Sequence, residues 1–318
     1  MKQPSFWFKN KNLVSFLLFP FGFLYEKIVF FRLKTTKPYK TKIPVVCVGN
    51  ICVGGTGKTP LSLALSEYFI RKSKNVFFLN HGYKSNLQNI MIDLREHKAS
   101  DVSDEAMIFA MKLPTVVDRN RARGAQKAEK LGADIVIMDD GFQNPLVYKR
   151  LSLVVFDGKR GIGNGLCMPA GPLRETLKQG LKRAHAAVIV GPDETDLAEK
   201  IKKLYPRLPI LFGHLEPKQS LKGLKGIAFA GIGHPEKFYT MLEKSGVHLV
   251  DKVSFPDHYA YTRADIKKLV KRKQPLFTTL KDAVKIDEDL RAQLTIVDVD
   301  FIFDNADEWE KLLSRKIK

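Results

Sequence analysis

Cysteine is scarce in this sequence, and its three copies are not arranged for crosslinking or metal binding. Cys47, Cys52 and Cys167 form no CxxC pair and no Cys/His cluster. An odd number of cysteines without ligand spacing argues against a disulfide framework or a structural zinc site, and it fits a reduced cytosolic setting. Repeats and low-complexity tracts are absent too. With 44% apolar residues, the chain can bury a sizeable core. Its length of 318 residues predicts about two domains.

Acidic residues are few relative to basic ones: 34 against 53, a net charge of +19. Such an excess implies an anionic partner, either nucleic acid, an acidic membrane or a phosphorylated substrate. The sequence lacks zinc-ligand spacing, an RNP-type aromatic motif and a heptad repeat beside a basic region, so no nucleic-acid partner is expected. It also lacks the Asn-Lys-x-Asp motif that reads guanine, which disfavours a GTPase.

The apolar N-terminal stretch at residues 13–31 has no small-residue cleavage site, so it does not resemble a signal peptide. Pro20 and the Glu26–Lys27 pair interrupt it, and its uncharged run is shorter than a spanning helix prefers. The segment therefore predicts an amphipathic helix lying in a membrane interface; a buried helix packed on the core is the alternative.

Basic residues surround this apolar stretch. Through residue 42 the chain has nine basic residues and one acidic residue. The nine are Lys2, Lys9, Lys11, Lys27, Arg32, Lys34, Lys37, Lys40 and Lys42. Lysines near an anionic surface each contribute about 1 kcal/mol. Residues 1–42 are therefore expected to form a membrane-associating segment on an acidic bilayer.

Short β-branched runs alternate with helical stretches from residue 43 to residue 212, which predicts an α/β fold with a mostly parallel sheet. Residues 206–213 read as a crossing strand. A smaller α/β unit is expected over residues 213–303, with one returning strand at 294–303. Residues 304–318 read as a helix that returns to the first domain.

The central motif is the glycine-rich sequence 53–59, Val-Gly-Gly-Thr-Gly-Lys-Thr, between a predicted strand and a predicted helix. Its backbone N–H groups and the helix N-terminus suit a phosphate, the lysine suits β- and γ-phosphates, and the final hydroxyl suits Mg²⁺. Cys52 replaces the first glycine of the strict pattern. The predicted ATP-binding residues are Gly54, Gly55, Thr56, Gly57, Lys58 and Thr59.

A second element for the phosphate site follows the apolar strand at 135–138. Asp139 and Asp140 end that strand and precede Gly141. P-loop enzymes bring a carboxylate to Mg²⁺ in this way, so one or both aspartates are candidate metal ligands together with Thr59.

The motif alone leaves the reaction open. A membrane-associated P-loop ATPase of the septum-positioning or partition type is one alternative. Those proteins characteristically have a lysine just before the paired glycines, where this sequence has Val53.

Six motifs in order make the sequence closely similar to the tetraacyldisaccharide 4'-kinase family of lipid A biosynthesis. They are Val48-Gly49-Asn50, Gly54 to Pro60, Asp139 to Gln143, Pro169 to Glu175, Phe255-Pro256-Asp257-His258 and Thr278-Thr279-x-Lys281-Asp282. The resemblance extends from the aromatic N-terminus to about residue 282.

The resemblance implies a P-loop NTPase-like domain and a smaller α/β domain joined by a two-stranded ribbon. It further implies a peripheral enzyme on the cytoplasmic face of the inner membrane, here expected to be a monomer. That enzyme would use ATP and Mg²⁺ to phosphorylate the 4'-hydroxyl of a tetraacylated glucosamine disaccharide 1-phosphate, giving lipid IVA.

The same resemblance assigns catalytic residues. Asp104 matches the aspartate of the family's Gly-Asp-Glu motif and would act as base, assisted by His258. Lys58 would hold the β- and γ-phosphates and neutralise charge during transfer. Glu105 would support the metal or the aspartate. A carboxylate can take the proton of a sugar hydroxyl, and a histidine can orient that carboxylate. Without the resemblance, Asp104–Glu105 reads as an exposed helix start and His258 as structural.

Three positions depart from the family pattern: His81 stands where arginine is usual, Ser103 where glycine is usual, and Asn144-Pro145 where a His-Arg-type pair is common. Arg119 and Arg174 are candidates for substrate contact, because guanidinium groups suit phosphate. His81 is a further candidate for a contact with substrate. A solvated basic face is the alternative for Arg119, Arg121 and Arg123.

Overall fold

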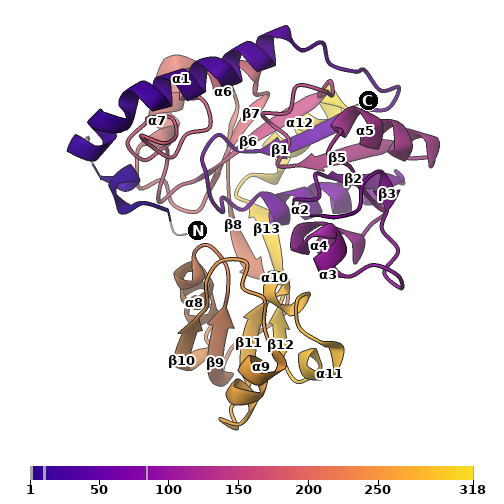
Figure 1. Ribbon diagram of the computed structural model, residues 1–318, viewed down its shortest axis with the longest axis vertical. Coiled ribbons are helices and arrows are strands. Elements are labelled where there is room, and N and C mark those ends of the chain that lie inside the picture. Colours follow the sequence, from indigo (N-terminus) through magenta and orange to yellow (C-terminus); the bar gives the residue numbers. More distant parts are fainter. Residues whose placement is uncertain (1–2, 10–11, 84, 318) are drawn as a thin grey trace.

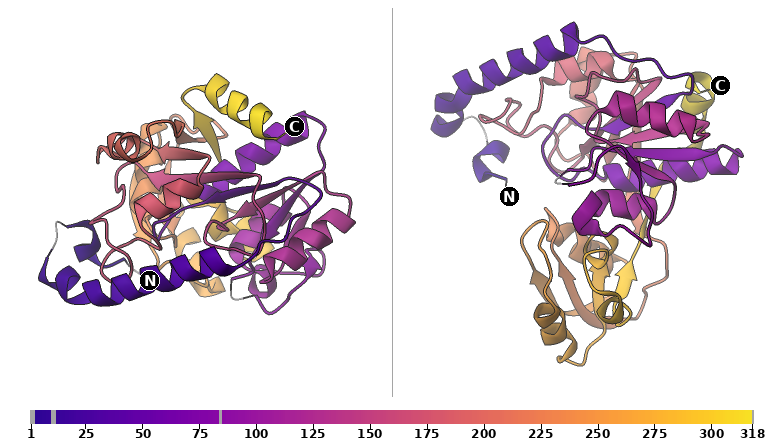
Figure 2. Two further views of the ribbon diagram at one scale, coloured as in Figure 1. Left: turned by 90° about the horizontal axis from the view of Figure 1, so that it is seen from above. Right: turned by 45° about the vertical axis from the view of Figure 1, so that its right-hand side comes forward.

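The computed structural model describes residues 3–9, 12–83 and 85–317, and Lys2 and Lys11 of the basic flank lie outside this part. The chain forms a larger and a smaller α/β lobe, and both termini belong to the larger one (Figure 1). The N-terminal helix crosses the larger lobe at the end away from the smaller lobe, as the views in Figures 1 and 2 agree.

The larger lobe is built on a nine-stranded sheet with the order β13-β8-β7-β6-β1-β5-β2-β4-β3, in which only β3 and β13 pair antiparallel. Most of its central strands are buried on both faces, as their β-branched, alternation-free sequences predict. The strands are β1 Val45–Gly49, β2 Val76–Asn80, β3 Ile90–Met91, β4 Thr115–Val117, β5 Ile135–Asp139, β6 Leu151–Asp157, β7 Ala186–Val190, β8 Ile210–Pro217 and β13 Val299–Phe303.

Helices cover both faces of this sheet and form two apolar cores. One core contains residues of α2 (Lys58–Arg71), α4 (Asp104–Ala110) and α12 (Ala306–Lys316). The other contains residues of α5 (Arg121–Lys130), α6 (Leu177–Arg183) and α7 (Leu197–Leu204). Trp309 and Leu313 place α12 on the larger lobe, although the chain reaches it from the smaller one. The short helix α3 (Ala99–Val102) precedes α4.

The smaller lobe is a four-stranded parallel sheet with the order β10-β9-β11-β12. Its strands are β9 Lys225–Ala230, β10 His248–Ser254, β11 Leu276–Thr279 and β12 Thr295–Val297. One face packs on α8 (Pro235–Lys244), and the other on α9 (Arg263–Val270) and α11 (Glu288–Arg291). The short α10 (Leu280–Ala283) follows β11 and contacts α4 of the larger lobe.

The two lobes are joined by an antiparallel ribbon of β8 and β13, in which Phe301 lies opposite Leu215. The single returning strand predicted at 294–303 is instead two strands. β12 belongs to the smaller sheet and β13 to the larger one, and they are separated only at Asp298. One apolar run therefore serves two sheets, a division that its alternating pattern does not reveal.

The N-terminal helix α1 (Leu13–Thr35) follows a short 3-10 helix, η1 (Ser5–Phe8), and contains Pro20. It docks through a narrow stripe: Ser15, Gly22 and Val29 are buried, at intervals of seven. A Cβ on Gly22 would lie 2.7 Å from the Cys167 carbonyl oxygen, so the close approach needs glycine there.

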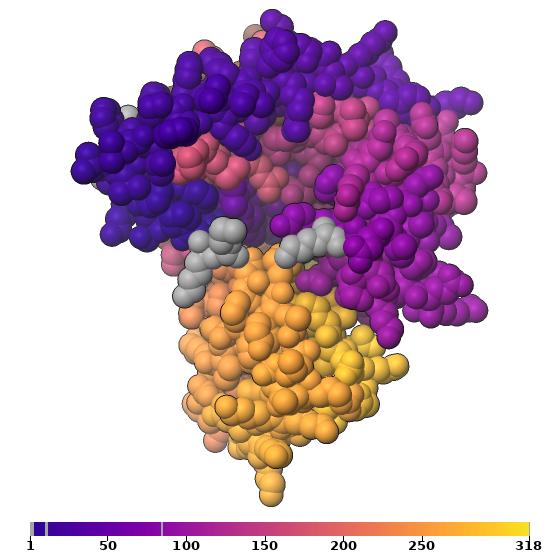
Figure 3. All heavy atoms as spheres, viewed as in Figure 1, coloured from indigo at the N-terminus to yellow at the C-terminus, as the bar shows by residue number. Residues whose placement is uncertain are grey.

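The apolar side chains of α1 face outward, whereas the alternative of a buried helix would have packed them on the core. Eleven of them are exposed: Leu13, Val14, Phe16, Leu17, Phe19, Phe21, Phe23, Leu24, Ile28, Phe30 and Phe31. In the described part of the chain, α1 is the one helix that is long and apolar enough to span a membrane, judged by length and composition. Of its most apolar 18-residue stretch, 17% is buried inside the protein. Figure 3 shows this helix as an indigo ridge along the larger lobe.

Candidate active site

The glycine-rich loop connects β1 to α2, at the carboxyl edge of the parallel sheet. Gly54 and Gly57 adopt φ values of 114° and 87°, in the region that favours glycine. The Asn50 amide closes the loop by donating to the Gly54 carbonyl at 3.3 Å and to the Thr56 hydroxyl at 3.4 Å. The loop thus has the strand–loop–helix setting that its sequence predicts.

A second segment braces this loop from outside. The Val53 N–H donates to the Pro172 carbonyl at 2.8 Å, and the Arg174 N–H donates to the Ile51 carbonyl at 2.7 Å. Cys52 and Leu173 form the antiparallel bridge between them. The Pro-Ala-Gly-Pro-Leu-Arg-Glu motif therefore fixes the phosphate loop as well as presenting Arg174.

Asp139 ends β5 and is 2% exposed. Its carboxylate accepts from the Ser62 hydroxyl at 3.1 Å and from the Thr59 hydroxyl at 3.5 Å. Burial raises the pKa of Asp139 to about 7, and nearby Glu105 and Asp140 add to the effect while Lys58 opposes it. A buried carboxylate whose charge is only partly balanced by Lys58 suits a site that a divalent cation completes.

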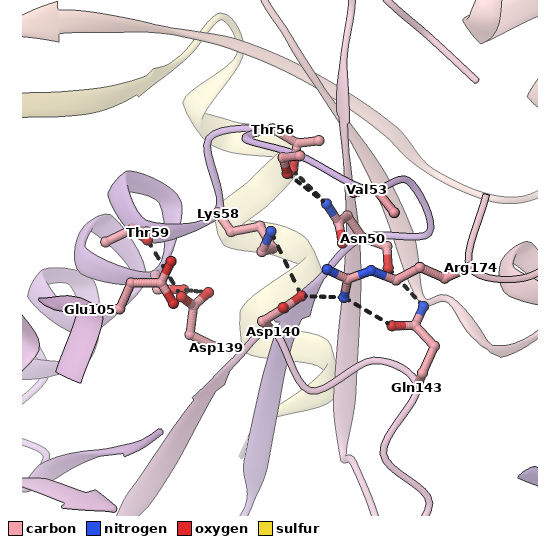
Figure 4. A network of polar contacts seen from close by, with 12 residues as sticks. Asn50, Val53, Thr56, Lys58, Thr59, Glu105, Asp139, Asp140, Gln143 and Arg174 are labelled. Carbon is pink, nitrogen blue, oxygen red and sulfur yellow. Dashed lines mark hydrogen bonds and ion pairs between the residues drawn. The ribbon is translucent and has the colours of Figure 1, made fainter. Parts of the chain in front are cut away.

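Asp140 has a different environment although it is the next residue. Its carboxylate lies 3.7 Å from Lys58 Nζ and accepts from Arg174 Nη1 at 2.8 Å (Figure 4). Burial would raise the pKa of Asp140, but Lys58 and Arg174 outweigh it and hold that pKa well below its usual range. The two adjacent aspartates therefore differ: one faces hydroxyl donors and the other is neutralised by two cations.

Glu105 lies beside this pair. Figure 4 shows its carboxylate pointing toward Thr59 and Asp139. Among the described residues no three Asp, Glu, His or Cys side chains form a ready-made metal cage. Mg²⁺ in nucleotide sites needs only one or two carboxylates, because phosphates and water supply the remaining ligands. The oxygens of Thr59 and Asp139, with Glu105 nearby, fit that requirement.

The structure brings Asp104 and His258 together from different lobes. Asp104 begins α4, and His258 lies in the loop after β10, with Nδ1 3.3 Å from Asp104 Oδ2. Burial would raise the pKa of Asp104, but the hydrogen bond with His258 and the charge of Lys285 outweigh it, so the pKa falls below its usual value. Asp104 is therefore ionised at neutral pH, as a base must be.

The backbone on both sides of this contact is unusual. Ser103, which stands where glycine is usual, has φ 95°, and its hydroxyl accepts from the Ala106 N–H at 3.4 Å as the N-cap of α4. His258 has φ 59°. Strain of this kind clusters at functional sites, because the surroundings must hold it in place.

The remaining predicted residues lie at the neighbouring strand ends. His81 follows β2, and burial, with Arg121 and Arg119, lowers its pKa. The Arg119 guanidinium donates to the Ser85 carbonyl at 3.0 Å. Within the described part of the chain, neither side chain makes a hydrogen bond or ion pair with the phosphate loop.

Arg121 does not belong to a solvated basic face. It is 2% exposed, and it donates to the carbonyls of Leu79 at 2.5 Å and Asp139 at 3.0 Å. Arg123, by contrast, is exposed and pairs with Asp118 through two hydrogen bonds of 2.6 and 2.9 Å. Spacing alone cannot separate these roles, since only the packing of α5 decides which arginine faces the sheet.

Known proteins resemble this chain over nearly its whole length. A family model described as tetraacyldisaccharide-1-P 4'-kinase matches residues 14–318. Proteins named tetraacyldisaccharide 4'-kinase are 44% identical in Paramagnetospirillum magneticum (96% of this chain, 95% of that one) and 41% identical in Rhodospirillum rubrum (100% and 98%). A crystal structure of the apo form of LpxK from Aquifex aeolicus in complex with ATP has a TM-score of 0.78 at 27% identity, covering 96% of this chain and 100% of that one.

Proposed function

The chain belongs to the tetraacyldisaccharide-1-P 4'-kinase family, and from that premise we propose how its residues carry out the reaction. It is a lipid A 4'-kinase, which transfers the γ-phosphate of ATP to the 4'-hydroxyl of tetraacyldisaccharide 1-phosphate and forms lipid IVA. The family match favours this activity over the alternative of a septum-positioning or partition ATPase.

The loop from Gly54 to Thr59 binds the ATP phosphates through its backbone N–H groups and Lys58. Lys58 and Arg174 both pair with the carboxylate of Asp140 at the edge of this loop. Both cations therefore lie where the ATP phosphates would bind, and both are proposed to bind those phosphates. Arg174 therefore serves the nucleotide rather than the 1-phosphate of the lipid.

Mg²⁺ binds at Thr59 and Asp139, with Glu105 as a supporting carboxylate. The support is the 3.5 Å contact between the Thr59 and Asp139 oxygens and the poor solvation of Asp139. Asp140 is the weaker candidate because two cations already neutralise it. The bound metal would neutralise charge that develops on the transferred phosphoryl group.

Asp104 takes the proton of the 4'-hydroxyl as the hydroxyl oxygen attacks the γ-phosphorus, and the bond to the β-phosphate oxygen breaks to release ADP. His258 orients the carboxylate from the other lobe, so the base is complete only when the two lobes meet. The single observation that carries this assignment is the 3.3 Å contact between His258 Nδ1 and Asp104 Oδ2. His81 and Arg119, at the neighbouring strand ends, are proposed to contact the lipid substrate.

The enzyme acts as a monomer on the cytoplasmic face of the inner membrane. The outward apolar side chains of α1 enter the acyl boundary, and the flanking lysines meet anionic headgroups. Because α1 docks through a narrow stripe of buried residues, most of its apolar surface is left for lipid.

The test is transfer of labelled phosphate from ATP to the disaccharide lipid in detergent micelles. Asp104→Asn keeps the shape of the side chain and should lower kcat by about 10²-fold or more, with little change in KM. Lys58→Met should lose both ATP affinity and turnover, and omitting Mg²⁺ should abolish transfer. Asp196→Asn, which alters an exposed carboxylate of the same lobe, is the matched control. Wild-type kcat in Asp104→Asn would show that the base lies elsewhere.

A further inference from the structure

The Thr278-Thr279-x-Lys281-Asp282 motif has no role in the reaction as described so far, yet it lies against the catalytic pair. Lys281 Nζ is 3.4 Å from Nε2 of His258, on the ring edge opposite Asp104, and 3.8 Å from Oε1 of Glu105. An ammonium group can donate hydrogen bonds but cannot accept them. A contact with Lys281 therefore requires a lone pair on Nε2.

We propose that Lys281 is a positioning residue for phosphoryl transfer: its ammonium holds the neutral His258 ring in the tautomer that carries the proton on Nδ1. In that tautomer the ring donates to Asp104 Oδ2, and the other carboxylate oxygen is available for the substrate hydroxyl. The inference rests on the proposed role of Asp104 as base. It concerns the placement of one proton and adds no step to the reaction.

The position of Lys281 is set by packing between the lobes. Lys281 lies on α10, whose Leu280 and the following Val284 pack against the core of the larger lobe. Val284 also packs against the cluster that contains Ala106 and Met107 of α4. The ammonium is thus held between the start of α4 and the histidine loop.

The same motif fixes the backbone of the histidine. The buried Asp282 accepts from the Gly231 N–H at 3.1 Å, and the Gly231 carbonyl accepts from the His258 N–H at 3.1 Å. Asp282 is itself held by the Thr279 hydroxyl and by Lys285, each at 2.8 Å. Adjacent residues of one turn therefore hold the main chain and the ring of His258.

A competitor at Nε2 explains why a cation is needed there. Asp257 Oδ1 lies 3.8 Å from Nε2 and is buried without a hydrogen-bond partner among the described residues. Without Lys281, this carboxylate would accept from a protonated Nε2. The ring would then present a lone pair to Asp104, and two acceptors would face each other.

The test is to measure the tautomer and the kinetics of the full-length enzyme. Protein labelled with ¹⁵N-histidine reports which ring nitrogen carries the proton, and His258→Gln identifies the His258 signals by their loss. At pH 8 we expect the proton on Nδ1 in the wild type and in Lys281→Arg, and a shift toward Nε2 in Lys281→Met. Lys267→Met removes an exposed charge from α9 of the same lobe and should leave the signals unchanged.

The kinetics should follow the tautomer. Lys281→Met should lower kcat by at least about tenfold, because a wrongly held tautomer disables a carboxylate–histidine pair. KM for both substrates should stay within about twofold, and Lys281→Arg should recover most of kcat. A wild-type ring protonated on Nε2 or on both nitrogens, or an unchanged tautomer in Lys281→Met, would overturn the inference. Failure of the proposed base is seen separately, as wild-type kcat in Asp104→Asn.

Discussion

Replacing Asp139 with asparagine should stabilise the nucleotide-free protein while abolishing its activity. Asp139 is buried at the end of β5, and its pKa is raised from 3.8 to about 7. The unfolded chain ionises this carboxyl near 3.8, whereas the folded chain retains the proton up to about pH 7. Stability therefore falls as pH rises through that window, and above it the full difference of ~4 kcal/mol is lost.

Asparagine has nearly the same shape and stays neutral at every pH. We therefore expect Asp139→Asn to exceed the wild type by up to ~4 kcal/mol at pH 8, or about 5–10 °C in Tm. At pH 5.5 the advantage should shrink to about half, because the wild type then keeps part of its proton. The assay is thermal and urea unfolding in EDTA, with no nucleotide present.

The matched control is Asp118→Asn, which alters another buried carboxylate in the same lobe. Asp118 makes two hydrogen bonds to Arg123, so its loss should lower stability at both pH values. Mg²⁺ with a non-hydrolysable ATP analogue should stabilise the wild type and have little effect on Asp139→Asn. If Asp139→Asn is no more stable than the wild type at pH 8, burial does not control this carboxyl and the reasoning fails.

Two further variants test the packing around the site and the membrane face. Arg121→Met should lower the free energy of unfolding by about 2–4 kcal/mol, since it removes two hydrogen bonds to the carbonyls of Leu79 and Asp139. Urea unfolding measures this loss, and a loss below about 1 kcal/mol would contradict the assignment. Replacing Phe16 and Phe23 together with serine should weaken flotation with anionic vesicles by about tenfold or more while kcat in detergent stays near the wild type, because both rings are exposed on α1. Unchanged flotation would show that α1 does not carry the membrane contact.

The larger sheet and its phosphate loop were predictable because their signals are local. The apolar strand predicted at 135–138 matches β5, and the glycine-rich loop lies between β1 and α2 as its sequence predicts. A buried parallel strand reads as a continuous β-branched run, and a phosphate loop needs its glycines, lysine and threonine in one order. The ribbon was implied only by the family resemblance, and the division of 294–303 between two sheets was not visible, because pairing partners lie far away in sequence.

What the sequence by itself determined is the chemistry available: a triphosphate loop, adjacent aspartates after a strand, and an apolar N-terminus with lysines around it. Only the tertiary structure decided which groups meet. It gives the two adjacent aspartates different surroundings: Asp139 faces hydroxyl groups, and Asp140 faces Lys58 and Arg174. It also buries Arg121 and places Lys281 on the far edge of His258. The physical reason is that protonation and charge pairing depend on burial and on distances of a few ångströms between distant segments, and only packing sets these.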